Sequence, residues 1–279
     1  MLAPASISVL EFRWAFPALD YKLVEAVSLD CTPADTSPLW QSALTSAESQ
    51  CARLEPGSSV EIILSNHFVR YLVIPAMPAF TPADQRVAIA AECFRQAYGD
   101  NADDWDIRVD PLAHADSMIA CAIDSALIAG LGALGKQYRL KIKSLQPYLM
   151  SGFNEARQRI RRTRIKASPV CYVQIEPERA TIALLRNGAW HAIASGRVPQ
   201  EWAQEVAAMV NREILLADWH AHPDAKPAIY LADAHSSSGD SGRSLSSATD
   251  YEVIPVQPAY THKAAGFSRQ HDAIALGKG

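Results

Sequence analysis

Both halves of this 279-residue sequence show the same order of predicted elements: strands, then a helix, then a strand. Residues 60–64 and 69–74 are rich in β-branched side chains and flank a turn at 65–68, which predicts a hairpin. Residues 170–195 predict a three-strand meander, with the hairpin signal Asn187-Gly188 at its second turn. This length suits one large domain or two lobes of about 130 residues each.

Helix signals separate the predicted strands. Thr81 and Asp84 open a helix that Gly99 ends, and Asp124 or Ser125 caps the next one. Apolar residues at spacings of three and four predict the buried stripes of these helices. The stripes consist of Val87, Ala91, Phe94 and Tyr98 in the first helix and of Leu127, Leu131, Leu134 and Tyr138 in the second.

Composition excludes several classes of protein. A hydrophobic content of 49% excludes a wholly disordered chain, and a net charge of -4 gives no general attraction to nucleic acids or anionic membranes. The five cysteines are far apart and show no metal-binding spacing, which indicates reduced thiols in the cytoplasm. No secretion signal or spanning segment is evident, so we expect a cytoplasmic protein that reaches a membrane only through partners.

Residues 235–250 are rich in serine and glycine and show no apolar periodicity, which predicts a flexible loop. The motif GDSG at 239–242 lies within it and matches the nucleophile loop of chymotrypsin-like proteases. Because a flexible loop cannot hold catalytic geometry, we do not assign catalysis to this motif.

Two charged segments invite a functional interpretation. Residues 218–224 place His220 and His222 between two aspartates, which is either a site for a divalent metal or the polar end of a helix. Residues 156–166 carry five arginines and a lysine, which suits a solvated helix between the lobes, an acidic protein surface or phosphate groups. No aromatic residues are interleaved with this basic run, so base stacking is unsupported, and we expect no nucleic-acid partner. We assign no metal site.

Four stretches carry a resemblance to a known family, together with the order of the elements. They are VEIILSNHFVRYLVIP (60–75), QRVAIAAECFRQAYG (85–99), SMIACAIDSALIAGLGALGKQYRLKIKSLQP (117–147) and VCYVQIEPERATIALLRNGAWHAIASGRV (170–198). The pattern resembles the actin-like cytoplasmic proteins of bacterial type IV pilus machines (the M protein) and type II secretion machines (the cytoplasmic part of the L protein). None of the stretches is an invariant catalytic signature.

The resemblance implies an α/β protein with a two-lobed actin-like fold, related to the RNase H-like duplication, with mixed sheets flanked by helices. Residues 1–150 would form the N-terminal lobe, with an inserted hairpin and helix subdomain. Residues 151–279 would form the C-terminal lobe, which contains the flexible loop at 235–250.

Actin-like relatives hold nucleotide phosphates with an acidic residue and a glycine in the first turn of each lobe. The corresponding stretches here, 8–14 and 174–179, contain no glycine. Pro177 removes an N–H donor, while Glu176 and Glu178 would place carboxylates near phosphate oxygens. We therefore expect no nucleotide cofactor and no catalytic residues, that is, a pseudo-ATPase.

The resemblance also implies a scaffold that binds an inner-membrane assembly protein of the pilus or secretion platform, with a motor ATPase as a further candidate partner. The partner-binding residues expected on the hairpin and its exit are Arg70, Tyr71, Pro75 and Phe80. A second interpretation remains open, in which Tyr71 belongs to the core and Arg70 is merely solvated.

Two rival functions remain open. One is an enzyme: an actin-like ATPase or phosphotransferase with atypical phosphate loops, or a hydrolase that uses His220 and His222. The other is a nucleic-acid binder that works through residues 156–166, which predicts binding with a steep salt dependence.

Overall fold

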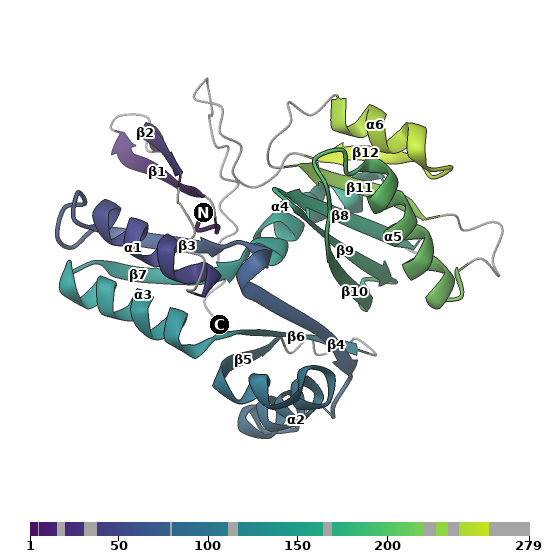
Figure 1. The fold of residues 1–279 in the computed structure, drawn as a ribbon, viewed down its shortest axis with the longest axis horizontal. Helices are drawn as coiled ribbons and strands as arrows, with labels where there is room; N and C mark the ends of the chain where they lie inside the picture. Colours follow the sequence, from purple (N-terminus) through teal and green to yellow (C-terminus); the bar gives the residue numbers. More distant parts are fainter. Residues whose placement is uncertain are drawn as a thin grey trace.

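The computed structural model shows two groups of elements joined by a helix (Figure 1). It describes residues 1–4, 6–15, 20–30, 38–78, 80–110, 117–163, 169–219, 227–233 and 240–256. The first group consists of β1 (Ser6–Ala15), β2 (Asp20–Asp30), α1 (Leu39–Cys51), β3 (Ser59–Leu64), the 3₁₀ turn η1 (Asn66–Phe68), β4 (Val69–Pro75), α2 (Ala83–Tyr98), η2 (Gly99–Asp104), β5 (Trp105–Asp110), β6 (Ser117–Asp124), α3 (Ser125–Gln137) and β7 (Lys141–Pro147). The second consists of α4 (Tyr148–Thr163), β8 (Val170–Glu176), β9 (Arg179–Arg186), β10 (Ala189–Arg197), α5 (Ala203–Leu216), β11 (Ala228–Asp233), α6 (Asp240–Ala248) and β12 (Val253–Val256).

The second group is built on one mixed sheet of order β10-β9-β8-β11-β12. β8, β9 and β10 form the expected antiparallel meander, whereas β11 pairs in parallel with both β8 and β12. Alternate residues of β8 serve opposite faces of the sheet, as the period of two requires. Tyr172 joins the apolar cluster that contains Leu149 of α4, and Val173 joins the cluster that contains Val210 of α5. Helices therefore flank this sheet on both faces.

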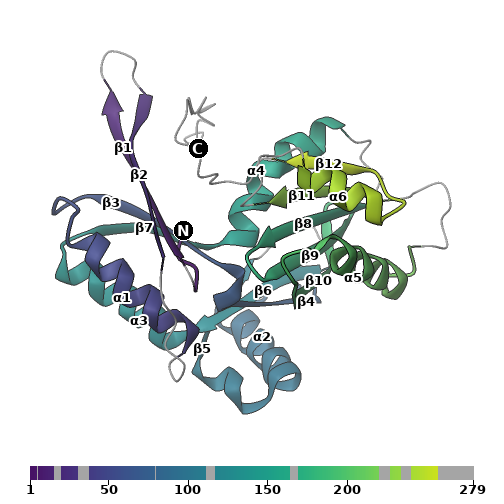
Figure 2. The same cartoon turned by 45° about the horizontal axis from the view of Figure 1, so that its top comes forward.

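The first group contains three smaller sheets: β1-β2, β3-β7 and β4-β6-β5. Figure 2 shows α1 and α3 side by side against β3 and β7, with the β1–β2 hairpin projecting beyond them. α2 covers β4-β6-β5, where Phe94 packs in one buried cluster with Ile74 and Met118. A separate apolar cluster contains Tyr71 of β4, Leu149 of α4 and Tyr230 of β11, so the two groups share a core.

The predicted hairpin at 60–74 is wrong, although both of its strands exist. β3 pairs in parallel with β7, and β4 pairs antiparallel with β6, so the two strands lie in different sheets. Local composition predicts extended backbone, but it does not choose the partner of a strand. β3 instead has a parallel partner that follows α3 in the chain. β4 instead belongs to the three-stranded sheet β4-β6-β5, which packs against α2. The inserted subdomain stays a prediction.

The prediction of a flexible loop at 235–250 is wrong for its second part, because residues 240–248 form α6; residues 235–239 lie outside the described part. Leu245 is fully buried in the cluster beneath α5. Gly242 lies so close to Pro255 that a Cβ on it would be 2.8 Å from the Pro255 ring. The buried Leu245 and the close contact of Gly242 thus dock α6 on the rest of the protein. The other residues of α6 are mostly polar, so its sequence has too little apolar periodicity to predict a helix.

Other local predictions are confirmed. Asp124 caps α3 by accepting a hydrogen bond from the Ala126 N–H at 2.8 Å, and Gly99 ends α2 with a φ of 70°. Asn187 and Gly188 both adopt positive φ, as a tight hairpin turn requires. The lobe boundary at residue 150 stays a prediction, and α4 runs across this position. No helix among the described residues is long and apolar enough to cross a membrane.

We expect Gly132→Ala to raise the free energy of unfolding by about 0.5 to 1 kcal/mol, because Gly132 lies in α3 with open space around its missing Cβ. Gly130→Ala is the matched control. Its Cβ would lie 2.5 Å from Cδ2 of Leu44 in α1, so Leu44 must leave its rotamer at a cost of about 0.5 to 1.5 kcal/mol. Urea unfolding of both variants measures the difference, and equal gains would contradict the close packing of α1 on α3.

Candidate functional site

The junction between the two groups is a network of buried polar side chains centred on Asn66. The Asn66 Oδ1 accepts hydrogen bonds from the Tyr71 hydroxyl at 2.6 Å and from the Leu149 N–H at 3.0 Å. Its Nδ2 donates to the Gln174 Oε1 at 2.8 Å. Asn66 is fully buried, and this one side chain ties η1 to β4, α4 and β8.

Glu176, the last residue of β8, forms the second connection. Its carboxylate accepts hydrogen bonds from the Ser65 hydroxyl at 2.5 Å and from the Asn66 N–H at 3.1 Å. The side chain is only 2% exposed. Burial raises the pKa of Glu176 to about 7, and the hydrogen bonds from Ser65 and Asn66 oppose that rise. The side chain of Glu176 is therefore engaged by hydrogen bonds from the segment before β4.

Two further contacts hold the β8–β9 turn against η1 and the end of β8 against α4. The His67 Nε2 lies 2.8 Å from the carbonyl oxygen of Pro177. Gln174 donates to the carbonyl oxygen of Tyr148 at 3.2 Å. Gly152 of α4 lies against this amide, because a Cβ on it would be 2.4 Å from the Gln174 Nε2. Only a residue without a side chain lets α4 approach β8 so closely.

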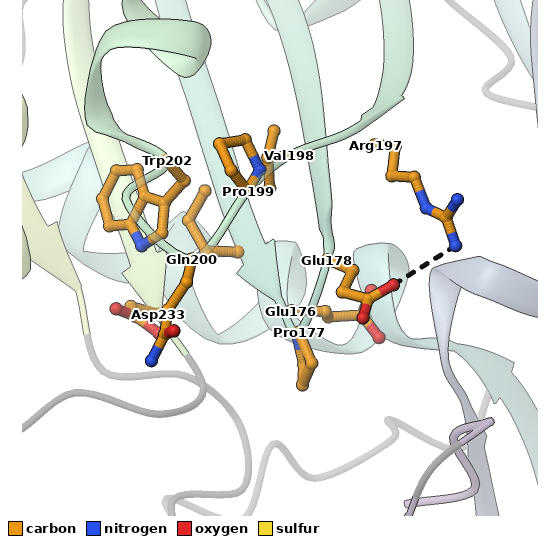
Figure 3. A pocket seen from close by; sticks show the side chains of 10 residues that line it. Glu176, Pro177, Glu178, Arg197, Val198, Pro199, Gln200, Trp202 and Asp233 are labelled. Carbon is orange, nitrogen blue, oxygen red and sulfur yellow. Dashed lines mark hydrogen bonds and ion pairs between the residues drawn. The ribbon is translucent and has the colours of Figure 1, made fainter.

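A cavity of about 810 Å³ lies beside the same turn (Figure 3). Proline, valine and tryptophan side chains form its apolar wall, and the carboxylates of Glu176, Glu178 and Asp233 also line it. Arg197 at its edge pairs with Glu178 at 3.3 Å, and both side chains are exposed. The complete lining consists of Ile175, Glu176, Pro177, Glu178, Arg197, Val198, Pro199, Gln200, Trp202 and Asp233.

These residues do not fit a nucleotide phosphate. Pro177 offers no N–H, and the lining contains no glycine at which phosphate oxygens could approach several backbone donors. The carboxylates of Glu178 and Asp233 would repel the phosphates, and Arg197 is already paired. Among the described residues, no group of three His, Cys, Asp or Glu is arranged to hold a metal ion that would offset this charge.

The structure changes the account of the two phosphate turns. Residues 8–14 belong to the first hairpin, as expected, and lie within its strand β1. Residues 174–179 do form the β8–β9 turn, where Glu178 adopts a positive φ of 56°. Glu176, expected to face phosphate oxygens, has its carboxylate engaged by Ser65 and Asn66 instead.

The four predicted partner-binding residues differ in how far they are exposed. Tyr71 is wrong as an external anchor: it is 6% exposed, and its hydroxyl is used by Asn66, so it belongs to the core. Arg70 is half-buried beside the junction. Pro75 and Phe80 are exposed, Phe80 by 87%, where the chain leaves β4 for α2.

The other sequence candidates are only partly described. His220 and His222 lie outside the described residues, as do the side chains of Arg159, Arg161 and Arg162 and the whole of residues 164–168. Ser241 of the GDSG motif donates its hydroxyl hydrogen to Asp233. This is a link between α6 and β11 and does not resemble the histidine contact that a serine nucleophile needs.

Ser65, Asn66 and Gln174 were not predicted to be members of the junction. Asn66 was interpreted as a turn residue, because asparagine is common in turns. A signal was available. Ser65 and Asn66 stand between two strands that are apolar on both faces, so a polar pair there must be buried and find partners.

We expect Glu176→Gln to gain about 2 kcal/mol of stability relative to wild type as the pH rises from about 5 to about 8. With a pKa near 7 in the folded protein against an ordinary 4.5, Glu176 is protonated in the folded state where the unfolded chain has lost the proton. Its stabilising contribution is therefore complete below about pH 4.5 and is lost as the pH rises through 7, whereas glutamine does not titrate.

Urea unfolding at both pH values measures this effect. Glu178→Gln, on the exposed side of the same turn, is the matched control and should keep the wild-type pH profile. A Glu176→Gln variant that is less stable than wild type at both pH values would show that the junction needs the ionised carboxylate.

The sequence matches no protein-family model and no curated protein. Solved structures do match. A PilM–PilN type IV pilus biogenesis complex is 14% identical, with 93% of this chain and 88% of that chain covered and a TM-score of 0.63. A Bacteroides thetaiotaomicron protein with an actin-like ATPase fold and unknown function is 11% identical, with coverages of 91% and 88% and a TM-score of 0.56.

A third match extends the likeness to secretion machines. It is the cytoplasmic domain of EpsL, an inner-membrane component of the type II secretion system of Vibrio cholerae. It is 10% identical, covers 90% of this chain and 85% of that one, and has a TM-score of 0.50. These likenesses confirm the predicted fold: the chain is an α/β protein with the actin-like ATPase fold, similar to the pilus and secretion proteins that its sequence pattern resembles.

Proposed function

We propose that this protein is a non-catalytic scaffold in the assembly of a type IV pilus or a type II secretion-like machine. It would work in the cytoplasm and reach the inner membrane by binding an assembly protein anchored there, with a motor ATPase as a further candidate partner. The support is the fold, which the chain shares with a PilM–PilN complex and with an inner-membrane component of a type II secretion system.

The junction at Glu176 is the observation that carries the non-catalytic part of this proposal. In this protein the two groups of elements are joined by their own buried side chains, with Ser65 and Asn66 on one side and Glu176 and Gln174 on the other. A protein joined in this way needs no bound nucleotide to set the relation of its halves. The cavity next to the junction is also lined by carboxylates that oppose phosphate binding. Both features support a pseudo-ATPase.

A second candidate, an actin-like ATPase or phosphotransferase, is favoured by one observation. The cavity lies at the carboxyl ends of β8 and β11, where open α/β sheets commonly take their ligands. Its volume of about 810 Å³ is also within the range of small-molecule sites.

Thermal unfolding with ATP and magnesium separates the two candidates. We expect no shift, because the turn lacks phosphate donors. A true site occupied at about a hundred times its dissociation constant would stabilise the protein by about 2.7 kcal/mol. A shift that ATP produces but AMP does not, and that is accompanied by hydrolysis, would overturn the pseudo-ATPase proposal.

We expect Phe80→Ala to weaken partner binding with little change in stability, because Phe80 is 87% exposed and contributes little to the core. Phe80 and Pro75 form an exposed apolar edge where β4 leads into α2. Co-purification with membrane proteins encoded by neighbouring genes tests this role. Leu216→Ala, at an exposed leucine on α5, is the matched control. If both variants retain the partner equally, the edge at Pro75 and Phe80 is not the docking surface.

A further inference from the structure

Arg70 has no carboxylate partner among the described residues. It lies on β4 next to the junction, and within this part of the chain its Nη1 donates to the carbonyl oxygens of His67 and Val69, both at 3.3 Å. Every ion pair found among the described residues involves other cations. A half-buried guanidinium normally finds a carboxylate, because its five N–H groups match that geometry.

Arg179, at the start of β9, has the same deficit. Its Nε is buried and has no hydrogen-bond partner among the described residues. Burial lowers the pKa of Arg179, and the nearby positive charge of Arg70 lowers it further. The negative charge of Glu176 raises this pKa, whereas the more weakly interacting Arg197 lowers it. The guanidinium groups of Arg70 and Arg179 therefore repel each other, and neither forms an ion pair with a described carboxylate.

The arginine cluster, defined as Arg70, Arg179 and Arg197, draws on both groups of elements. Arg70 comes from β4, whereas Arg179 and Arg197 are cross-strand neighbours on β9 and β10. The contact between His67 and Pro177 holds the two sides together. Of these three arginines, Arg197 alone has a carboxylate partner in the described part of the chain; the partner is Glu178, and the pair is exposed. An anion bound to this cluster would contact both halves of the protein.

The neighbouring cavity indicates what kind of anion fits. Arg197 lines the cavity and is the cross-strand neighbour of Arg179, so it connects the cavity to the cluster. Figure 3 shows Arg197 at the edge of the cavity, paired with Glu178. The cavity wall of Pro177, Val198, Pro199 and Trp202 suits apolar side chains, while the carboxylates of Glu178 and Asp233 oppose a multiply charged phosphate. A single carboxylate flanked by apolar residues meets both conditions.

We propose that the arginine cluster and the adjoining cavity form a docking site for an acidic, apolar segment of a partner polypeptide. Its carboxylate would bind Arg70 and Arg179, and its apolar side chains would pack against Pro199 and Trp202. This inference rests on the proposed scaffold function and names the chemistry of one partner segment. The site is separate from the exposed edge at Pro75 and Phe80.

Two blocked synthetic peptides of leucine and proline test the proposal, one carrying a single aspartate and the other an asparagine at the same position. Binding is followed by the side-chain Nε–H resonances of ¹⁵N-labelled arginine in the full chain. We expect the aspartate peptide to shift the resonances of Arg70 and Arg179 with a dissociation constant of about 1 mM or tighter. The asparagine peptide should bind at least about tenfold more weakly, and added salt should weaken the aspartate peptide.

Arg70→Gln separates a binding role from a structural one. It should weaken the aspartate peptide about tenfold without lowering the Tm, because removing one of two repelling cations relieves the other. Arg108→Gln is the matched control, since Arg108 lies on β5 and already has Asp106 as a partner at 2.8 Å. It should leave peptide binding unchanged.

Three results would overturn the inference: equal binding of the two peptides, no binding of either up to about 10 mM, or an Arg70→Gln variant with a clearly lowered Tm. If ATP also fails to bind, the proposed scaffold function still stands. ATP binding that depends on Arg70 and Arg179 and is tighter than that of the aspartate peptide would overturn both.

Discussion

Two buried side chains, Asn66 and Glu176, hold the two groups of elements in one arrangement. Each polar atom of the Asn66 side chain has a partner, and the Glu176 carboxylate accepts from both Ser65 and Asn66. A buried polar group without a partner costs about 1 to 3 kcal/mol, so any other arrangement of the halves would leave several such groups unpaired. Apolar packing favours contact between the halves, but this network determines how they meet.

The same network bears on the nucleotide chemistry of the fold. The Glu176 side chain at the end of β8 accepts hydrogen bonds from the segment before β4, and Pro177, which follows it, has no backbone N–H to donate. What remains beside the turn is a cavity whose apolar wall and carboxylates suit a polypeptide better than phosphates. The composition of the β8–β9 turn thus supports both proposals, the absence of nucleotide chemistry and the docking of a polypeptide segment.

The arginine cluster contrasts with the junction beside it. At the junction every acceptor of Asn66 and Glu176 is used, whereas Arg70 and Arg179 have no ion-pair partner among the described residues. Repelling cations lower the stability of the free protein, and a bound carboxylate would remove that cost. The polar groups of the junction therefore satisfy one another, whereas those of the arginine cluster would be satisfied by the proposed ligand.

The sequence by itself determined the secondary structure where local signals are strong, such as the cap at Asp124, the end of α2 at Gly99 and the turn at Asn187-Gly188. It also indicated the fold, through the resemblance of its element order and of four stretches to actin-like proteins. Only the tertiary structure decided that β3 pairs with β7 and not with β4, that Leu245 docks α6, and that Tyr71 is a core residue. The physical reason is that caps and turns depend on neighbours in the chain, whereas strand pairing and the partners of buried polar groups depend on residues far apart in sequence, such as Ser65 and Glu176.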